Sequence, residues 1–299
     1  MGKLFLAAML SGLAALGLAG CGGGGGGSSS DTQLPPVPPN DSQFLLTGSF
    51  GEAVFGNHLI TGMTLGPNGN IYVSCNNSID EFTPSGVTVL SVPAHIGSGE
   101  RTSPTPGGLA VDAAGNIFAT DGQSGCIDAY DSAGKFRREF PVDPGAPNQN
   151  ITSVSLGPDN KIYGSDPADN LIIKYSRGGE FLGHISTPNT PNILLVAKDG
   201  SFYGVASTSV EHLSPTGALL KTASSEAWTD SGFLDSDGNL WVGNVERHLV
   251  TEYTSSLVSL GQFSPLVNGT AWGVVVGAGG KLYIATQGPS NIEELTPKK

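Results

Sequence analysis

The chain has 299 residues, of which 44 are glycine, 20 are proline and only 13% are charged. This composition favours many short strands joined by turns over a helical fold. The formal net charge is −12, and the sequence has no basic stripe that could neutralise phosphates. Nucleic acid is therefore excluded as a partner, and so is electrostatic adhesion to anionic lipid.

The N-terminus has the pattern of a secretion signal. Lys3 precedes an apolar and small-residue run over residues 4–19, which is too short and too rich in glycine and alanine for a membrane span. The run ends in Leu18-Ala19-Gly20-Cys21, which resembles the bacterial lipobox. The resemblance implies a signal peptide over residues 1–20 and a diacylated Cys21 at the mature N-terminus. The alternative is an ordinary signal peptide in which Cys21 is incidental.

The resemblance also implies a location in the bacterial cell envelope. Gly22 follows the cysteine, which implies the outer membrane, facing the periplasm, in a host with two membranes. In a host with one membrane the protein is expected on the outer face of the plasma membrane.

Residues 21–41 are expected to form a tether. Gly22–Gly27 and three serines predict a flexible coil, and residues 34–39 (Leu-Pro-Pro-Val-Pro-Pro) predict extended polyproline. The remainder, residues 42–299, is expected to be one folded domain.

Six repeats with a period of 38 to 46 residues fill that domain. Each repeat has a short apolar run, a tight polar turn, an aromatic residue two positions later and two further apolar runs or strands. The repeats are residues 62–82, 108–130, 153–175, 193–213, 232–253 and 273–295. Four strands in about 42 residues predict one blade of a β-propeller.

The repeats resemble NHL repeats. The second is the nearest match, with Gly108-Leu109-Ala110-Val111-Asp112 before a turn and strand over residues 115–121. The resemblance covers about residues 44–299. It implies an all-β six-bladed propeller of four-stranded antiparallel blades, similar to the streptogramin lyase-like and gluconolactonase-like superfamily.

The chain ends are predicted to close the ring. The sixth repeat stops at Lys299 without a fourth strand, and residues 43–50 have a strand pattern ahead of the first repeat. We expect them to complete the last blade, since an open edge favours aggregation. Aromatic residues of the second strands are expected to pack between blades as core: Tyr72, Phe118, Tyr163, Tyr203, Trp241 and Tyr283.

A ligand site is expected on the face that carries the longer blade connections, because function concentrates on loops held by a rigid scaffold. The candidate residues there are His95, Arg101, Trp228 and Trp272, and the expected ligand is a protein or a saccharide. The alternative is that each tryptophan fills its own loop.

The ends of the second strands offer a candidate cation site. Asp121, Asp166 and Asn244 supply oxygen ligands suited to Ca²⁺ or another divalent cation. The alternative is that these side chains cap nearby backbone N–H groups. No other cofactor is expected.

Evidence for catalysis is missing from the motifs. Streptogramin lyase-like propellers use a histidine just before the opening glycine of a blade, and a glutamate fourteen residues later. The corresponding pre-glycine positions here are Thr61, Gly107, Thr152, Asn192, Ser231 and Trp272. The sequence therefore favours a monomeric, non-catalytic binding module, with a divergent metal-dependent propeller hydrolase or lyase as the alternative.

Cys75 and Cys126 lie in adjacent repeats and in a compartment that is expected to be oxidising. They form either a disulfide or two free thiols.

Overall fold

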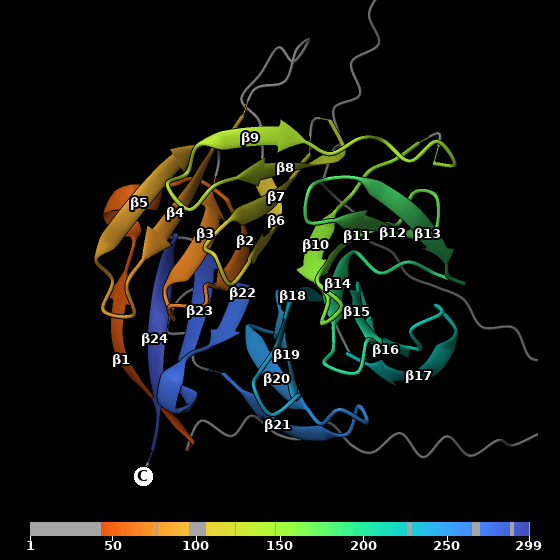
Figure 1. Ribbon diagram of the computed structural model, residues 1–299. Coiled ribbons are helices and arrows are strands. Elements are labelled where there is room, and N and C mark those ends of the chain that lie inside the picture. Colours follow the sequence, from red (N-terminus) through yellow and green to blue (C-terminus); the bar gives the residue numbers. More distant parts are fainter. Residues whose placement is uncertain are drawn as a thin grey trace, which may run out of the picture. The chain divides into compact units, whose positions relative to one another are not determined.

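Each of the six repeats folds into one four-stranded antiparallel sheet, and the sheets follow one another in a ring (Figure 1). The computed structural model describes residues 43–75, 77–95, 106–122, 124–146, 148–225, 229–264, 270–287 and 290–298. The architecture is a six-bladed β-propeller, as the repeats predicted.

In each blade the first strand is innermost and the fourth is outermost. Blade 1 contains β2 (Ile60–Leu65), β3 (Ile71–Cys75), β4 (Ser78–Phe82) and β5 (Thr88–Pro93). Blade 2 contains β6 (Pro106–Val111), β7 (Ile117–Asp121), β8 (Cys126–Tyr130) and β9 (Phe136–Glu139). Blade 3 contains β10 (Ser153–Leu156), β11 (Lys161–Asp166), β12 (Leu171–Ser176) and β13 (Phe181–Ser186).

The second half of the ring repeats this order. Blade 4 contains β14 (Ile193–Val196), β15 (Phe202–Ala206), β16 (Ser209–Leu213) and β17 (Leu219–Ser224). Blade 5 contains β18 (Thr229–Leu234), β19 (Leu240–Asn244), β20 (Leu249–Tyr253) and β21 (Ser259–Phe263). Blade 6 contains β22 (Thr270–Val276), the 3₁₀ turn η1 (Ala278–Gly280), β23 (Leu282–Gln287) and β24 (Asn291–Pro297).

Strand β1 (Phe44–Phe50) supplies the fourth strand of blade 6 and closes the ring. It pairs antiparallel with β24, from Phe44 opposite Pro297 to Phe50 opposite Ile292. This confirms the strand predicted over residues 43–50. At the start of β1, the ring of Phe44 meets the rings of Phe263 at 5.0 Å and Trp241 at 6.4 Å, so the strand also packs against blade 5.

The tight turns form because short polar side chains bond to their own backbone. Asp112 Oδ1 accepts the N–H groups of Ala114 and Asn116, both at 2.9 Å. Gly115 supplies the positive φ of 81° that this turn needs. The repeated turn chemistry therefore explains why each repeat folds back at the same place.

The six second-strand aromatics are core residues, as predicted. All six are buried, and each packs in a cluster with inner residues of the next blade. Tyr72 of blade 1 packs with Leu109 of blade 2, and Tyr283 of blade 6 packs with Ile71 of blade 1. The hydrophobic core is thus divided into six interfaces that run round the ring.

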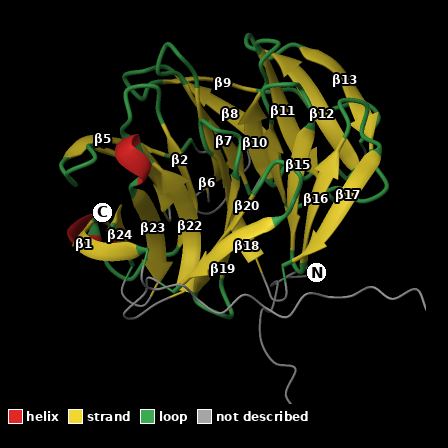
Figure 2. Cartoon of the chain, turned by 90° about the horizontal axis from the view of Figure 1, so that it is seen from below, coloured by secondary structure: helices red, strands yellow, loops and turns green. Residues whose placement is uncertain are grey.

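The connection from β1 to β2 contains a one-turn helix, α1 (Glu52–Phe55), which the sequence pattern did not predict (Figure 2). The buried Phe55 anchors the turn, with its ring 5.4 Å from that of Phe82. A single turn has too few residues to show a helical repeat. In the described part of the chain, no helix has the length and apolar character needed to cross a membrane.

Candidate functional site

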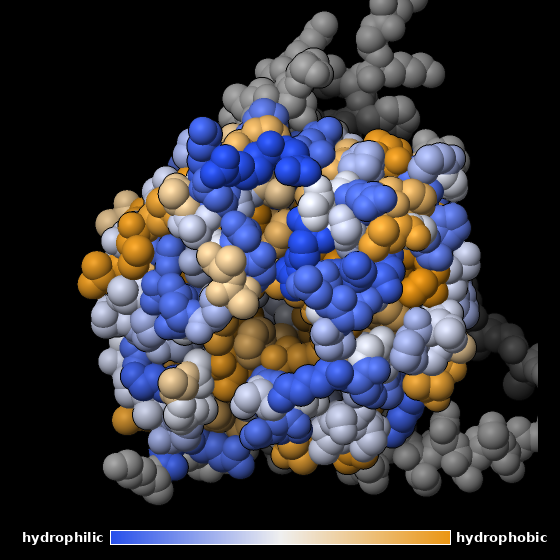
Figure 3. Space-filling view, in the orientation of Figure 1, coloured by the Kyte–Doolittle hydropathy of each residue, from blue (hydrophilic) through white to orange (hydrophobic). Residues whose placement is uncertain are grey.

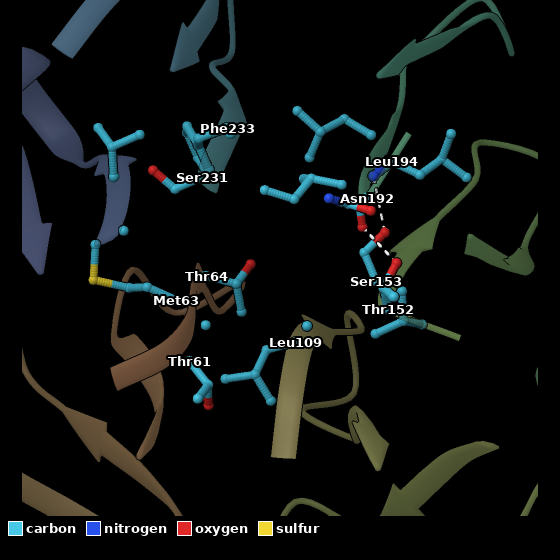
Figure 4. A pocket seen from close by; sticks show the side chains of 18 of the residues that line it. Thr61, Met63, Thr64, Leu109, Thr152, Ser153, Asn192, Leu194, Ser231 and Phe233 are labelled. Carbon is cyan, nitrogen blue, oxygen red and sulfur yellow. Dashed lines mark hydrogen bonds between the residues drawn. The ribbon is translucent and has the colours of Figure 1, made fainter. Parts of the chain in front are cut away.

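The first strands of all six blades enclose a central cavity of about 350 Å³ (Figure 4). Figure 3 shows a hollow at the middle of the ring with hydrophobic atoms on its wall. Because every blade contributes its innermost strand, residues up to 213 positions apart in sequence line one space.

Two kinds of side chain line this cavity. Polar residues at the starts of the first strands are Thr61, Thr152, Asn192 and Ser231, and Trp272 holds the same position in blade 6. Apolar residues two positions further along are Met63, Leu109, Val154, Leu194, Phe233 and Val274. Among the described residues that line the cavity, none is ionisable.

Glycines let the inner strands approach one another. A Cβ atom on Gly108 would lie 2.7 Å from Cα of Ser153 in the next blade, and one on Gly273 would lie 3.0 Å from Cβ of Met63. The first distance is shorter than real Cβ contacts, and the second would require Met63 to shift by a few tenths of an ångström. The glycines that open the repeats therefore set the width of the cavity.

Hydrogen bonds on the cavity wall join blade 3 to blade 4. Thr152 Oγ1 donates to the carbonyl oxygen of Asn192 at 2.7 Å, and Ser153 Oγ accepts the N–H of Leu194 at 2.8 Å (Figure 4). Ser231 differs, because its side chain is 7% exposed and its Oγ has no hydrogen-bond partner. The wall thus holds one buried hydroxyl whose hydrogen-bonding capacity is unused.

Of the four predicted ligand residues, Trp272 lies at the cavity. It is half-buried, and its Nε1 donates to Thr270 Oγ1. His95 lies elsewhere. Its ring stacks on that of Phe136 with centroids 3.5 Å apart, and its backbone N–H donates a hydrogen bond to the Tyr130 hydroxyl. Arg101 and Trp228 lie outside the described residues, as does Cys21.

The predicted cation ligands are buried, and two of them accept hydrogen bonds from nearby backbone. Asp166 Oδ1 accepts the N–H groups of Asn150 and Ala168, and Asn244 Oδ1 accepts that of Arg247 at 2.8 Å. Asp121 is also buried, at the end of β7. None of the three lines the cavity.

Asp166 and Asn244 cap backbone N–H groups of nearby loops, and this role accounts for the hydrogen bonds that their side-chain oxygens accept from backbone. Within the described ranges, no three His, Cys, Asp or Glu side chains are grouped to hold a metal ion. Burial raises the pKa of Asp166 above its ordinary value.

The possible disulfide is not formed, and Cys75 and Cys126 are both free and buried. The two thiols face different neighbours. Cys75 packs in a cluster with Val275 and Ile292 of blade 6, whereas Cys126 Sγ accepts a hydrogen bond from Gln149 Nε2, at 3.8 Å, in the connection to blade 3. Burial raises the pKa of each thiol to about 11.

The sequence reasoning missed two sets of residues. The first is the polar ring of the cavity, whose positions the family resemblance connects with a catalytic histidine and not with a cavity lining. The second is a row of buried acids on the third strands, Asp80, Asp128, Glu211 and Glu293. Each follows a β-branched residue of the repeat, and that pattern was the available signal for the row.

No protein-family model and no curated protein matches the sequence. Solved structures match the fold. A streptogramin B lyase structure has a TM-score of 0.64 at 15% identity, covering 86% of this chain and 99% of that chain. Catalytically inactive virginiamycin B lyase from Staphylococcus aureus with quinupristin has a TM-score of 0.58 at 17% identity, covering 79% of this chain and 80% of that chain.

A propeller of another kind is similar in fold to a comparable degree. The WD40 β-propeller domain of Doa1 has a TM-score of 0.61 at 12% identity, covering 81% of this chain and 79% of that chain. At these identities the likeness is one of fold, and propellers host both enzymes and binding scaffolds. The chain is a six-bladed β-propeller that resembles streptogramin B lyase in fold.

Proposed function

We propose that this propeller is a non-catalytic binding module that takes an uncharged group of its ligand into the central cavity. The observation that carries the proposal is the lining, in which the described residues are apolar, hydroxyl, amide or glycine, with one tryptophan. Such a surface binds by burial and hydrogen bonding, and it supplies no acid, base or nucleophile activated by a base.

The lining favours a protein ligand over a saccharide. Eight aliphatic or phenylalanine side chains and Trp272 line the cavity, against six hydroxyl or amide side chains. A branched aliphatic or aromatic side chain from a protein loop would bury its carbon atoms there, while the exposed amide of Asn192 would bond to its backbone. A sugar would leave most of its hydroxyls unpaired against that wall.

A panel of defined ligands tests this proposal. Neutral peptides with a leucine or phenylalanine at a loop tip, the same peptides with lysine or glutamate there, and neutral disaccharides are each added to the purified full-length protein. We expect a neutral peptide to raise the Tm and the charged versions to have no effect. Stabilisation by disaccharides alone would replace the protein ligand with a saccharide.

Two cavity variants complete this experiment. Trp272→Ala should abolish the rise in Tm and Trp272→Phe should keep most of it, because the aromatic face is what the ligand contacts. An equal response of wild type and Trp272→Ala, or no response to any neutral ligand, would contradict the cavity as the site.

The second candidate is a divergent hydrolase or lyase, which the fold likeness to streptogramin B lyase favours. Against it stand Trp272 and Thr286, at the positions where the family resemblance implies the histidine and the glutamate. Neither is an acid–base group at neutral pH. Quinupristin and simple lactones are the substrates to assay by mass spectrometry, and turnover at enzyme-like rates would replace the binding module with this candidate.

We further propose that the propeller is held at the bacterial envelope by a lipid on Cys21. The support is the match of residues 18–21 to a lipobox and the Gly/Ser/Pro sequence that follows. Cys21→Ser should move the protein from the membrane fraction to the soluble fraction, and Ser30→Cys in that variant should not restore it. Unchanged membrane retention of Cys21→Ser would exclude the anchor.

A further inference from the structure

A second cavity, of about 580 Å³, lies where the tight turns of blades 5 and 6 meet. One wall is the turn between β18 and β19, with Asp235 and Asn239, and the other is the turn between β22 and β23, with Val276 and Gly280. Leu65, at the end of β2, also lines it. This space is named the turn-side groove here, and no described residue lines both the groove and the central cavity.

Three carboxylates line the turn-side groove, those of Asp235, Asp237 and Glu252. Neutral donors hold two of them in place. Asp235 Oδ2 accepts the Nε1–H of Trp241 at 2.9 Å, and Glu252 Oε1 accepts the Nδ2–H of Asn239 at 2.9 Å. Among the described residues that line the groove, none is lysine, arginine or histidine. The acids are therefore fixed in position without a cation in the lining to balance them.

The acids of the groove also keep acceptor oxygens available. Within the described part of the chain, Oε2 of Glu252 and the exposed carboxylate of Asp237 make no hydrogen bond or ion pair. Lys198 of blade 4 donates to the carbonyl oxygen of Ser236 and does not line the groove. Burial raises the pKa of Glu252 above its ordinary value, and the charge of Asp235 raises it further. A cation bound between these two acids would relieve that repulsion.

Other blades balance the acids of their turn side with a cation of the chain itself. Glu252 lies opposite Trp241 in blade 5, and no cation lines the groove beside it. The ion pairs in the other blades are Asp112 with Arg177 at 3.9 Å, Asp159 with Lys174 at 2.8 Å, and Glu294 with Lys281 at 2.5 Å. Blade 5 thus presents acids to a cavity where three other blades supply their own positive charge.

The remainder of the groove is apolar. Leu65, Val276 and Ala278 line it, and Phe44 and Pro297 line it where β1 and β24 pair. In Figure 3, hydrophobic atoms extend from the middle of the ring between blades 5 and 6, and hydrophilic atoms of blade 5 border them. A ligand that fits this lining has a positive charge on an apolar stem, as long basic side chains have.

We propose that the turn-side groove binds an arginine side chain of a partner polypeptide. The guanidinium would donate to Asp235 and Glu252, and its methylene stem would pack on the apolar wall. In the described ranges, no three acidic side chains are grouped to hold a metal ion, so a cation with spread donors fits better than a point charge. Arginine also fits better than lysine, because its planar fork carries five N–H donors and is less strongly hydrated.

This site is independent of the function proposed for the central cavity. The groove lies at the ends of β2 and β22, whereas the polar ring of the central cavity lies at the starts of the first strands. Either proposal can therefore fail without the other, and one partner in the groove would leave the polar ring accessible to a second.

Calorimetric titration of the purified full-length protein at low salt tests the groove. The probes are the peptide acetyl-Leu-Arg-Leu-amide and its versions with citrulline or lysine in place of arginine. Citrulline keeps the shape of arginine and removes its charge. The variants are Glu252→Gln, which keeps the oxygen that Asn239 bonds to, and Asp237→Asn at an exposed position.

The matched control is Glu81→Gln in blade 1. Glu81 lies opposite Tyr72 as Glu252 lies opposite Trp241, it accepts a hydrogen bond from an asparagine side chain as Glu252 does, and it does not line the groove. The control therefore removes the same charge from the same place in another blade.

We expect the arginine peptide to bind the wild type and Glu81→Gln equally. Glu252→Gln should weaken binding by about tenfold or more, and Asp237→Asn should weaken it less. The citrulline and lysine peptides should bind the wild type more weakly than the arginine peptide. Because Asp237 is exposed, its variant keeps the fold and still tests the site if Glu252→Gln is unstable.

Four results would overturn this inference. Equal weakening by Glu252→Gln and Glu81→Gln would mean that the net charge of the protein, and not the groove, attracts the peptide. Unchanged binding in both groove variants, or no binding of the arginine peptide to the wild type, would exclude the groove as the site. Equally tight binding of the citrulline peptide would exclude a role for charge, and equally tight binding of the lysine peptide would exclude arginine as the selected side chain.

Discussion

Glycines near the centre of the ring, which lack a Cβ atom, allow neighbouring strands and blades to approach closely. Gly108, Gly243 and Gly273 each lie where an added methyl group would meet the adjacent blade or strand. Ser231 Oγ is one such neighbour, 2.2 Å from the position of a Cβ on Gly243. The cavity wall therefore tolerates little change in side-chain volume.

Gly108→Ala should destabilise the protein by about 1–3 kcal/mol, because its new methyl group would overlap the backbone of Ser153. Gly178→Ala is the control, since its Cβ would meet only Ser176 Oγ at 3.6 Å, and it should change stability by less than about 0.5 kcal/mol. Urea denaturation of both variants gives the comparison. Equal stability of the two would mean that the inner strands have room to separate.

The two thiols should be inert in the folded protein. With a pKa of about 11 for both Cys75 and Cys126, about one thiol in a thousand is ionised at pH 8. A thiol-specific reagent should react with neither Cys75 nor Cys126 in the native protein. It should react with both after the protein is unfolded without a reductant. Fewer thiols after unfolding would show that a disulfide exists.

The same pKa values predict a loss of stability at high pH. The folded-state pKa lies above the ordinary value of 9.0 for both thiols. The unfolded chain therefore loses its thiol protons first, and stability should fall as the pH rises from about 9 to 11. Cys75→Ala combined with Cys126→Ala should flatten that decline, and an unchanged decline would assign it to other groups.

Among the elements, β1 is the one that turns six repeats into a closed ring. Its partner strand β24 lies about 250 residues later in the chain, so the pairing forms only when the two ends meet. Phe44 adds contacts with blade 5 through Trp241 and Phe263. One strand thus holds the first and the last repeats together.

Phe44→Ala should destabilise the protein by about 2 kcal/mol, through lost burial and two lost aromatic contacts. It should also change the fluorescence of Trp241. Leu219→Ala, on an outer strand and exposed, should cost less than about 0.5 kcal/mol. Thermal unfolding of the two variants gives the comparison. An equal Tm for Phe44→Ala and Leu219→Ala would mean that the contacts of β1 with blade 5 do not stabilise the closed ring.

For the whole molecule, the ring determines which side chains can cooperate. Asp121, Asp166 and Asn244 occupy matching positions in three blades, and the ring holds each beside its own loop. Side chains on first strands are the ones that meet at the centre. The distance from the axis, which the strand's place within its blade sets, therefore decides whether residues can share a ligand.

Added Ca²⁺ or Mg²⁺ should leave the Tm of the whole protein unchanged, and so should a chelator. A cation bound at a hundred times its Kd would add about 2.7 kcal/mol, which is a shift of several degrees. A rise in Tm that Asp166→Asn removes would establish the cation site and favour the hydrolase alternative.

The sequence by itself determined the fold, because a propeller blade is a local structure. The turn signals, the strand period and the second-strand aromatics all act within one repeat, and six copies of one pattern make the assignment robust. It also determined the closing strand, since copy six lacks a fourth run and residues 43–50 supply one.

The tertiary structure alone decided the candidate site. Thr61 and Asn192 are 131 positions apart, yet they line one cavity because each begins a first strand. Trp272 was predicted as a loop residue and His95 as its companion, but one lines the cavity and the other stacks on Phe136. Side-chain neighbours across a ring depend on where separate strands meet, and no spacing within a single repeat encodes that.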